Sequence, residues 1–265
     1  MRIKRREFLK TAGGAALLGF GGISAFKVLE RGRAEASAVL RDPKALTGKR
    51  WGIVVDVSKL NVETMKKCMD ACHREHNVPF IENPKEEIKW IWKETFEHSF
   101  PETEDKYLAE EIKHMPLLVL CNHCDNPPCV RVCPTKATFK RKDGIVMMDM
   151  HRCIGCRFCM AACPYGARSF NWRDPRPLIK EENKEFPTRM KGVVEKCTLC
   201  YERLDKGREP ACVEASDGAL VFGDLEDPNS EVRKILGSRY SIRRKPELGT
   251  LPSVYYINVG GIEYA

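Results

Sequence analysis

The chain has 265 residues, 43% of them hydrophobic and 31% charged, which excludes a disordered or fibrous protein and leaves room for one or two compact domains. The formal net charge is +8, but residues 1–36 carry eight Lys or Arg against three Glu (+5), so the rest carries only +3. A nucleic-acid-binding function therefore has little electrostatic support.

Residues 1–36 have the pattern of an export signal. Lys4-Arg5-Arg6 precedes Phe8-Leu9-Lys10, and an uncharged, glycine-rich stretch runs from Thr11 to Ala25. This order is typical of a twin-arginine signal, whose pathway exports proteins already folded around their cofactors. Ala34-Glu35-Ala36 is a candidate cleavage site, and an uncleaved leader that tethers the protein is the alternative. We therefore expect the protein on the periplasmic or other extracytoplasmic face of the membrane.

The next segments predict a strand, a helix and an insertion. Trp51–Asp56 is an apolar run, as in a buried strand, and residues 61–72 indicate a helix that ends on Cys72. Residues 80–115 form an insertion in which Ile88, Trp92 and Phe96 recur at helical spacing. A partner could dock on this apolar stripe, but we favour packing against its own domain.

Thirteen cysteines fall into four groups along the chain. The groups are Cys68 and Cys72; Cys121, Cys124, Cys129 and Cys133; Cys153, Cys156, Cys159 and Cys163; and Cys197, Cys200 and Cys212. The third group, followed by Pro164, is the bacterial ferredoxin run C-x2-C-x2-C-x3-C. In this run the first three thiolates hold one cubane cluster and the fourth binds the cluster of a second, paired motif.

Other cysteine chemistries explain the spacing less well. A structural zinc site gives no reason for the C-x3-C-P ending, and disulfides between cysteines so close in sequence are strained. Cys68 to His73 is one residue longer than the C-x-x-C-H haem attachment site. We expect the other histidines, including His123, to lie at the surface or beside the sites rather than to bind metal.

Pairing the second group with the third, and the first with the fourth, predicts three complete [4Fe–4S] clusters. The ligand sets are Cys121, Cys124, Cys129 and Cys163; Cys133, Cys153, Cys156 and Cys159; and Cys72, Cys197, Cys200 and Cys212. A fourth cluster would need thiolates where Leu60, Met65 and Ser216 stand, so Cys68 is predicted not to be a ligand. Pairing neighbouring groups instead would leave Cys133 without a cluster.

This pairing predicts an α+β fold with two ferredoxin-like double-cluster modules. Residues 50–79 with 192–225 form the outer module, and residues 116–172 form the inner one. Residues 173–191 link the modules, and residues 226–265 form a tail. In that tail Ser230 is expected to cap a short helix that ends at Gly237, and Ser253–Val259 is expected to be the last strand. The sequence contains no phosphate-binding loop, nucleophile elbow or acid/base pair, so we expect no catalytic residue.

Taken together, the motifs resemble the ferredoxin-type electron-transfer subunits of polysulfide and dimethyl sulfoxide reductases, and in particular exported DsrO- and HmcB-type subunits. The resemblance is carried by the runs Cys121–Cys129, Asp143–Val146, Cys153–Cys159, Cys163–Arg168, Glu195–Cys200 and Pro252–Tyr256. It implies a quinone-handling membrane subunit of the NrfD type, a multihaem cytochrome c and a complex of dissimilatory sulfur metabolism.

We therefore expect a non-catalytic electron-transfer subunit with no small-molecule substrate of its own. The alternative is the iron–sulfur subunit of an exported molybdopterin reductase, against which the chain's own leader argues mildly. A module whose clusters only stabilise the fold is the third possibility, although paired motifs exceed what stability alone requires.

Overall fold

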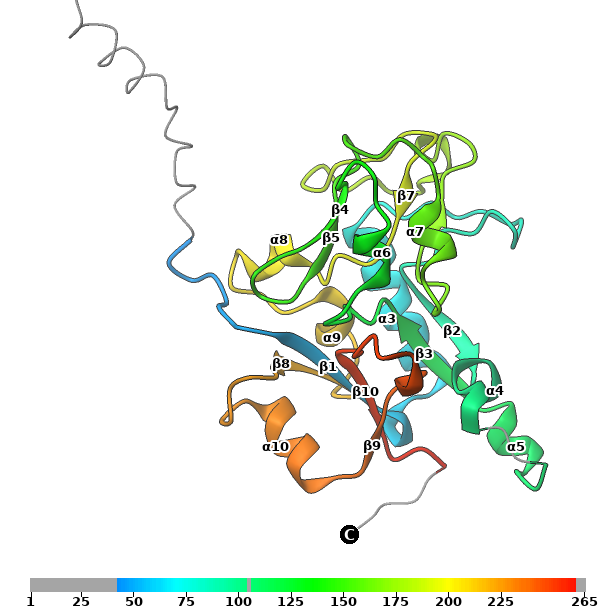
Figure 1. Ribbon diagram of the computed structural model, residues 1–265, viewed down its shortest axis with the longest axis vertical. Coiled ribbons are helices and arrows are strands. Elements are labelled where there is room, and N and C mark those ends of the chain that lie inside the picture. Colours follow the sequence, from blue (N-terminus) through cyan, green and yellow to red (C-terminus); the bar gives the residue numbers. More distant parts are fainter. Residues whose placement is uncertain (1–41, 104–105, 261–265) are drawn as a thin grey trace, which may run out of the picture. The chain divides into compact units, whose positions relative to one another are not determined.

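A four-stranded sheet with the order β8-β1-β10-β9 organises the computed structural model, which describes residues 42–103 and 106–260 (Figure 1). β1 (Trp51–Asp56) runs parallel to β10 (Val254–Ile257) and antiparallel to β8 (Leu220–Asp224). β9 (Ser241–Ile242) pairs with the outer edge of β10. All residues of β1 are buried, as its uninterrupted apolar sequence predicts. The predicted leader, 1–36, lies outside the described residues.

The other elements are short, with one exception. The helices are α3 (Val62–Glu75), α4 (Phe96–Ser99), α5 (Glu110–Lys113), α6 (Pro128–Arg131), α7 (Phe158–Ala161), α8 (Tyr201–Leu204), α9 (Ala211–Glu214) and α10 (Glu231–Ser238). The remaining strands pair as β2 (Ile91–Thr95) with β3 (Pro116–Leu120), β4 (Thr138–Lys140) with β5 (Val146–Met148), and β6 (Ser169–Phe170) with β7 (Val194–Glu195). Within the described ranges, no helix combines the length and apolar character needed to cross a bilayer.

Helix α3 carries the first cysteine group, and its start is fixed by sequence. The Asn61 side chain accepts a hydrogen bond of 2.8 Å from the Thr64 N–H, as an N-cap does. Met65, Cys68 and Cys72 are buried on one face of the helix, which packs against α9. The helix predicted over 61–72 is therefore confirmed, and it extends to Glu75.

The C-terminal tail forms the helix and strand that its sequence predicts. Ser230 caps α10 by accepting from the Arg233 N–H at 3.3 Å, and the helix ends at Ser238, one residue beyond Gly237. Val232 of α10 packs on Val54 of β1 in a small apolar cluster. β10 occupies the centre of the predicted last strand and shares the sheet with β1 and β8.

The helical spacing in the insertion is a wrong prediction. Ile91–Thr95 is strand β2, paired along its length with β3, and only Phe96 begins a short helix. The four-residue spacing is accidental, because Trp90, Ile91 and Trp92 form a continuous buried run that suits a strand. Ile88, Trp92 and Phe96 are nevertheless all buried, so their packing within the domain is confirmed.

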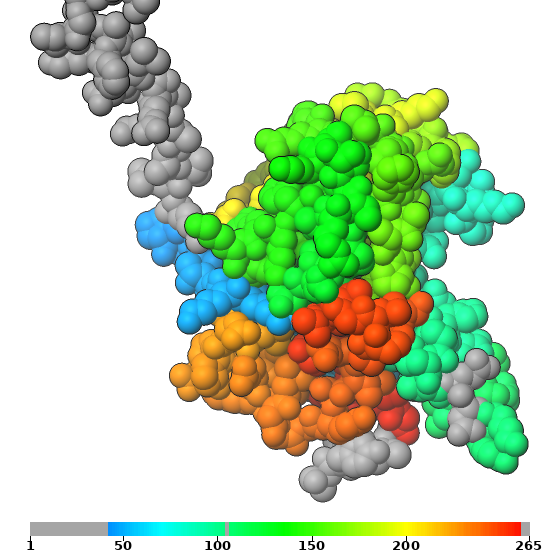
Figure 2. All heavy atoms as spheres, viewed as in Figure 1, coloured from blue at the N-terminus to red at the C-terminus, as the bar shows by residue number. Residues whose placement is uncertain are grey.

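The C-terminal segment also covers the second cysteine group. The backbone N–H groups of Asp125 and Asn126 donate to the carbonyls of Leu251 and Thr250, and Ser253 N–H donates to Asn122. Figure 2 shows this orange-to-red segment directly below the green segment that carries the cysteine loops. One apolar cluster joins sheet residues such as Ile53 and Tyr256 to Cys124 and Cys197, so the loops rest on the core of the sheet.

Candidate functional site

Cys121, Cys124, Cys129 and Cys163 line a single cavity. Cys129 comes from α6, which begins at Pro128, where a proline needs no N–H partner. Burial raises the pKa of the Cys124 thiol to about 12, and the thiolates of Cys121, Cys163 and Cys129 add to the effect. Four thiolates so close together, two of them buried and two half-buried, are unfavourable without bound metal, whose charge offsets their repulsion.

A second cavity is lined by Cys133, Cys153, Cys156 and Cys159. This site lies nearer the surface, since Cys156 is exposed and Cys133 and Cys153 are half-buried. Burial raises the pKa of Cys133, but hydrogen bonds from the backbone of Thr138 and the side chain of Thr135 outweigh it, and the net pKa is lowered. Hydrogen bonds from neighbouring residues therefore stabilise the thiolate form of Cys133 in the second site.

The third cysteine site joins α3 to the fourth cysteine group. Cys72, Cys197, Cys200 and Cys212 are all buried. Burial raises the pKa of Cys72 well above its usual value, and the thiolates of Cys200, Cys197 and Cys212 raise it further. Cys72 on α3 and Cys212 on α9, more than one hundred positions apart in sequence, thus come together where these two helices pack against each other, a contact that we call the seam of α3 and α9.

The cysteine loops share one backbone conformation. In three of the four C-x2-C units the residue before the second cysteine has positive φ: 40° at His123, 70° at Gly155 and 56° at Leu199; in the fourth, Cys156–Cys159, the positive φ is one residue earlier, 63° at Arg157. Non-glycine residues rarely adopt this conformation, so its recurrence marks a constrained loop. Backbone N–H groups point at sulfur within these loops, from Leu199 to Cys197 at 3.3 Å and from Ala211 to Cys200 at 3.4 Å. Such N–H···S bonds stabilise thiolate ligands.

Buried polar atoms without partners surround the cysteines. They are Asn122 Nδ2 and Oδ1, His123 Nε2, Arg168 Nη2 and Thr198 Oγ1. Asn122 and Thr198 occupy the same position in their C-x2-C units. Buried donors normally have partners, and an anionic group between the thiolates would supply acceptors for the donors among these atoms. The residues present therefore fit cubane iron–sulfur clusters, whose sulfur atoms accept hydrogen bonds.

The three cysteine sites form a row. Cys129 of the first site raises the pKa of Cys159 in the second, after the larger effect of burial. Cys121 of the first site likewise contributes to raising the pKa of Cys197 in the third to about 12, which burial dominates. Packing gives the same order, since Cys129 shares one apolar cluster with Cys159 and Cys124 shares another with Cys197, so the first site adjoins both of the others.

The surroundings of Cys68 are apolar. Cys68 is fully buried in the core cluster with Met65, and Leu60 packs against that cluster. Ser216 is also fully buried, and its hydroxyl is engaged by donating to the Val213 carbonyl at 2.7 Å and accepting from the Leu220 N–H at 3.0 Å. The place where a fourth cluster would need ligands is filled by ordinary core packing.

The histidines nearest the cysteines make bonds of their own. His123 Nδ1 accepts from the Val146 N–H at 3.1 Å. Burial lowers its pKa well below the usual value, helped by the cations Lys196 and Arg168. His76 stacks on Trp90, and its Nε2 lies 2.7 Å from Glu202 Oε1. His76, Cys200 and Glu202 are close enough to hold a metal ion, but the pairing of Nε2 with Glu202 gives that histidine a partner already.

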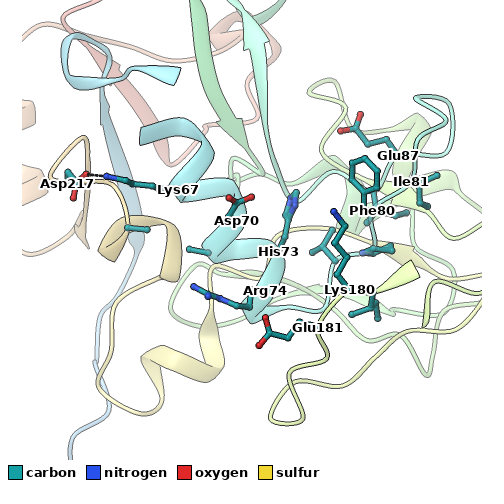
Figure 3. Close-up of a pocket in the computed structure, with 16 residues that line it drawn as sticks. Lys67, Asp70, His73, Arg74, Phe80, Ile81, Glu87, Lys180, Glu181 and Asp217 are labelled. Atoms are coloured by element: carbon teal, nitrogen blue, oxygen red, sulfur yellow. Dashed lines mark hydrogen bonds and ion pairs between the residues drawn. The ribbon is translucent and has the colours of Figure 1, made fainter. Parts of the chain in front are cut away.

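A hollow of about 670 Å³ lies beside the third site. Figure 3 shows Lys67, Asp70, His73 and Arg74 on α3 along one side, with Phe80 and Lys180 on loops opposite. A smaller hollow of about 300 Å³ shares Ala71, Arg74 and Ala215 with it, so the surface is depressed along the seam of α3 and α9. Cys72 and Cys212 lie on the two elements that form this seam.

Sequence reasoning did not single out Lys196 and Arg168, which are buried between the cysteine sites. Each lies inside a run that carries cysteine ligands, Glu195-Lys196-Cys197 and Cys163–Arg168. A basic residue within such an apolar, cysteine-bearing run was the available signal.

Comparison with known proteins supports an iron–sulfur protein. Residues 113–176 match the family model described as a 4Fe-4S dicluster domain. The chain is 43% identical to the Hdr-like menaquinol oxidoreductase iron-sulfur subunit 1 of Archaeoglobus fulgidus, over 98% of this chain and 99% of the relative. It is 38% identical to a putative dimethyl sulfoxide reductase iron-sulfur subunit from Halobacterium salinarum (78% and 79% covered). It is 36% identical to the menaquinone reductase iron-sulfur cluster-binding subunit of Nitratidesulfovibrio vulgaris (79% and 89%).

Proposed function

Because the chain belongs to the family of iron–sulfur electron-transfer subunits of quinone- and sulfur-type oxidoreductases, we propose that it relays single electrons through three [4Fe–4S] clusters. The observation that carries the proposal is the gathering of twelve cysteines into three adjacent sites. The first site takes Cys121, Cys124, Cys129 and Cys163; the second takes Cys133, Cys153, Cys156 and Cys159; and the third takes Cys72, Cys197, Cys200 and Cys212. This set contains every cysteine except Cys68.

Metal and electron counting tests the three clusters. Purified under anaerobic conditions, the chain should contain about twelve irons and as many acid-labile sulfides, four of each per cubane. Reduction should develop electron paramagnetic resonance (EPR) signals that integrate to three spins and show coupling between neighbours. About sixteen irons would instead require a fourth cluster at Cys68, and an iron-free folded protein would exclude the relay altogether.

The second-site end of the row supplies one docking face. Cys156 is exposed there, and Ile154 and Phe158 on its two sides are 67% and 60% exposed. Large apolar side chains at a soluble surface are typical of subunit interfaces. We assign this face to the quinone-interacting membrane subunit of the NrfD type that the family resemblance implies.

The third-site end supplies the other docking face. The exposed ring of Phe80 lines the hollow along α3. A partner bound in this hollow would lie next to α3 and α9, the helices that carry Cys72 and Cys212. No fourth cluster would be needed between the partner and the third site. We assign this face to the second redox partner, a multihaem cytochrome c in a complex of dissimilatory sulfur metabolism. The twin-arginine leader pattern of residues 1–36 supports assembly on the extracytoplasmic side.

Isolation of the native complex, with subunits identified by mass, tests these partners. Phe158→Asp should release the membrane subunit and leave the second partner in place, while Phe80→Asp should do the reverse. Both rings are largely exposed, so neither change should disturb folding. If both variants released the same partner, the two-ended assignment would be contradicted.

An alternative partner is a molybdopterin reductase. The similarity to a protein named as a dimethyl sulfoxide reductase subunit favours it. Isolation of a molybdopterin protein attached to the Phe80 face would establish this alternative in place of the cytochrome.

A further inference from the structure

Two basic side chains are buried in the walls between the cysteine sites. Lys196 has no solvent exposure and Arg168 is 5% exposed. Neither forms an ion pair with a carboxylate anywhere in the described part of the chain. Because Lys and Arg are almost never buried without an anionic partner, both positions require negative charge that these described carboxylates do not supply.

Lys196 lies between the first and third sites. Its ammonium donates to two backbone carbonyls, those of Val146 and Cys197. Val146 lines the cavity of the first site, and Cys197 belongs to the third. One cation therefore faces both sites.

Arg168 occupies the corresponding place between the first and second sites. It lines the first cavity, and its Nη1 donates to Thr138 Oγ1 at 3.1 Å, where Thr138 lines the second. Its Nη2 has no partner and is buried.

Other buried basic groups contrast with these two. Arg189 lies 2.7 Å from Glu195, and Arg203 lies 3.0 Å from Glu75. Arg244 donates to the Ser99 carbonyl at 3.1 Å and lies over the ring of Tyr165. Arg189 and Arg203 are neutralised locally, and Arg244 bridges no pair of cysteine sites, so the placement of Lys196 and Arg168 is specific.

We propose that Lys196 and Arg168 are the fixed counter-charges of the relay, each favouring the added electron on the two sites that it separates. The middle site lies between both cations and is favoured by both. Each one-electron reduction adds one negative charge among four thiolates, the electron coming from the neighbouring site or from the partner that donates to the row. No proton needs to follow, because a permanent cation is already present in a low-dielectric wall. This inference rests on the proposed function.

The test is an anaerobic redox titration of the full, cluster-loaded chain with dithionite, followed by EPR. Arg168→Gln should lower the potentials of the first and second sites, and Lys196→Gln those of the first and third. We expect each affected site to become at least tenfold harder to reduce, which is about 59 mV for a one-electron couple. Arg168→Lys and Lys196→Arg, which keep the charge, should restore most of the shift.

Two control proteins make the titration interpretable. Cys72→Ala lacks a ligand of the third site and so identifies its signal. Arg233→Gln removes an exposed guanidinium on α10, outside the walls, and should leave all three potentials in place. Iron content is measured first: an iron-free wild-type chain would defeat the proposed function itself, before the cations are tested.

The role of the cations would be overturned if a Gln variant shifted the reduction potentials of all three sites equally. It would also be overturned if a Gln variant with all its clusters showed no shift in potential. If a Gln variant cannot hold its clusters, the pattern of loss decides. The proposal is supported if a Gln variant loses only the clusters of the two sites that its cation adjoins, and if the charge-conserving variant retains those clusters. Loss of the clusters from all three sites refutes the proposal.

Discussion

At the scale of single residues, Cys72 is the most informative of the proposed ligands because it reaches its site from a separate helix. Cys72→Ala should remove about four of about twelve irons, leaving the first and second sites intact. The neighbouring Cys68→Ala is the matched control, since Cys68 lies one helical turn away on the same face and should cost no iron. Iron analysis checks both, and loss of two clusters from Cys72→Ala would contradict the assignment of its site.

A second residue-scale prediction concerns the buried pair of Arg189 and Glu195. Both side chains are at most 2% exposed, and Glu195 also accepts from the indole of Trp90. Arg189→Met leaves Glu195 charged without its cation, so the free energy of unfolding should fall by about 3–5 kcal/mol. Chemical denaturation of the loaded protein measures it. Lys206→Met, which breaks the exposed pair with Glu185, should change stability little.

The sequence alone could predict which cysteines belong together, but not the basic residues Lys196 and Arg168 that lie between the cysteine sites. The spacing of cysteines is dictated by the cluster that they enclose, so it survives in the sequence as a pattern. Lys196 and Arg168 follow no spacing rule. Their types are normally exposed, so their position inside a cysteine-bearing run is a weak signal, and the three-dimensional structure is needed to show that they are buried.

At the scale of elements, the loop of the second site depends on Gly155. A Cβ added there would lie 2.5 Å from the Gly192 carbonyl oxygen, in addition to the strain of φ +70°. Gly155→Ala should therefore push the loop away from residue 192, destabilise the second site and lower its cluster occupancy.

Gly192→Ala is the matched control for that change. Its φ is +88°, but an added Cβ meets nothing within 4 Å, so only backbone strain of about 1–2 kcal/mol is added. Iron content and the second-site EPR signal compare the two variants. Equal effects would show that contact with the Gly192 carbonyl is unimportant.

Prediction succeeded for elements whose signal is local and failed where packing decides. The apolar run of β1 and the capped, amphipathic α3 carry their structure in their own residues. Residues 88–96 show helical spacing by accident, and pairing with β3 holds them as a strand. No local feature of the sequence reveals that distant partner.

At the scale of the whole molecule, the sheet and the cysteine loops should respond differently to iron removal. Ile53, Val54 and Val55 are fully buried in the sheet, whereas the second and third cysteine groups lie in loops, with one cysteine of each group on a helix of four residues. Such short helices are not stable alone. Anaerobic chelation should therefore expose residues 121–163 to hydrogen exchange first, while residues 51–56 stay protected. Simultaneous exchange of both regions would contradict separate sources of stability.

The pairing of β1 with both β8 and β10 has a consequence for biosynthesis. Residue 53 meets residue 254 in one direction and residue 222 in the other, so neither neighbour exists until long after the first strand has been made. The first strand must wait unpaired while some 170 residues are made, a delay that long-range contacts impose on folding in general. The sheet therefore closes only when the later part of the chain has been made, and the cysteine site of Cys72 cannot be complete before Cys212 has been added.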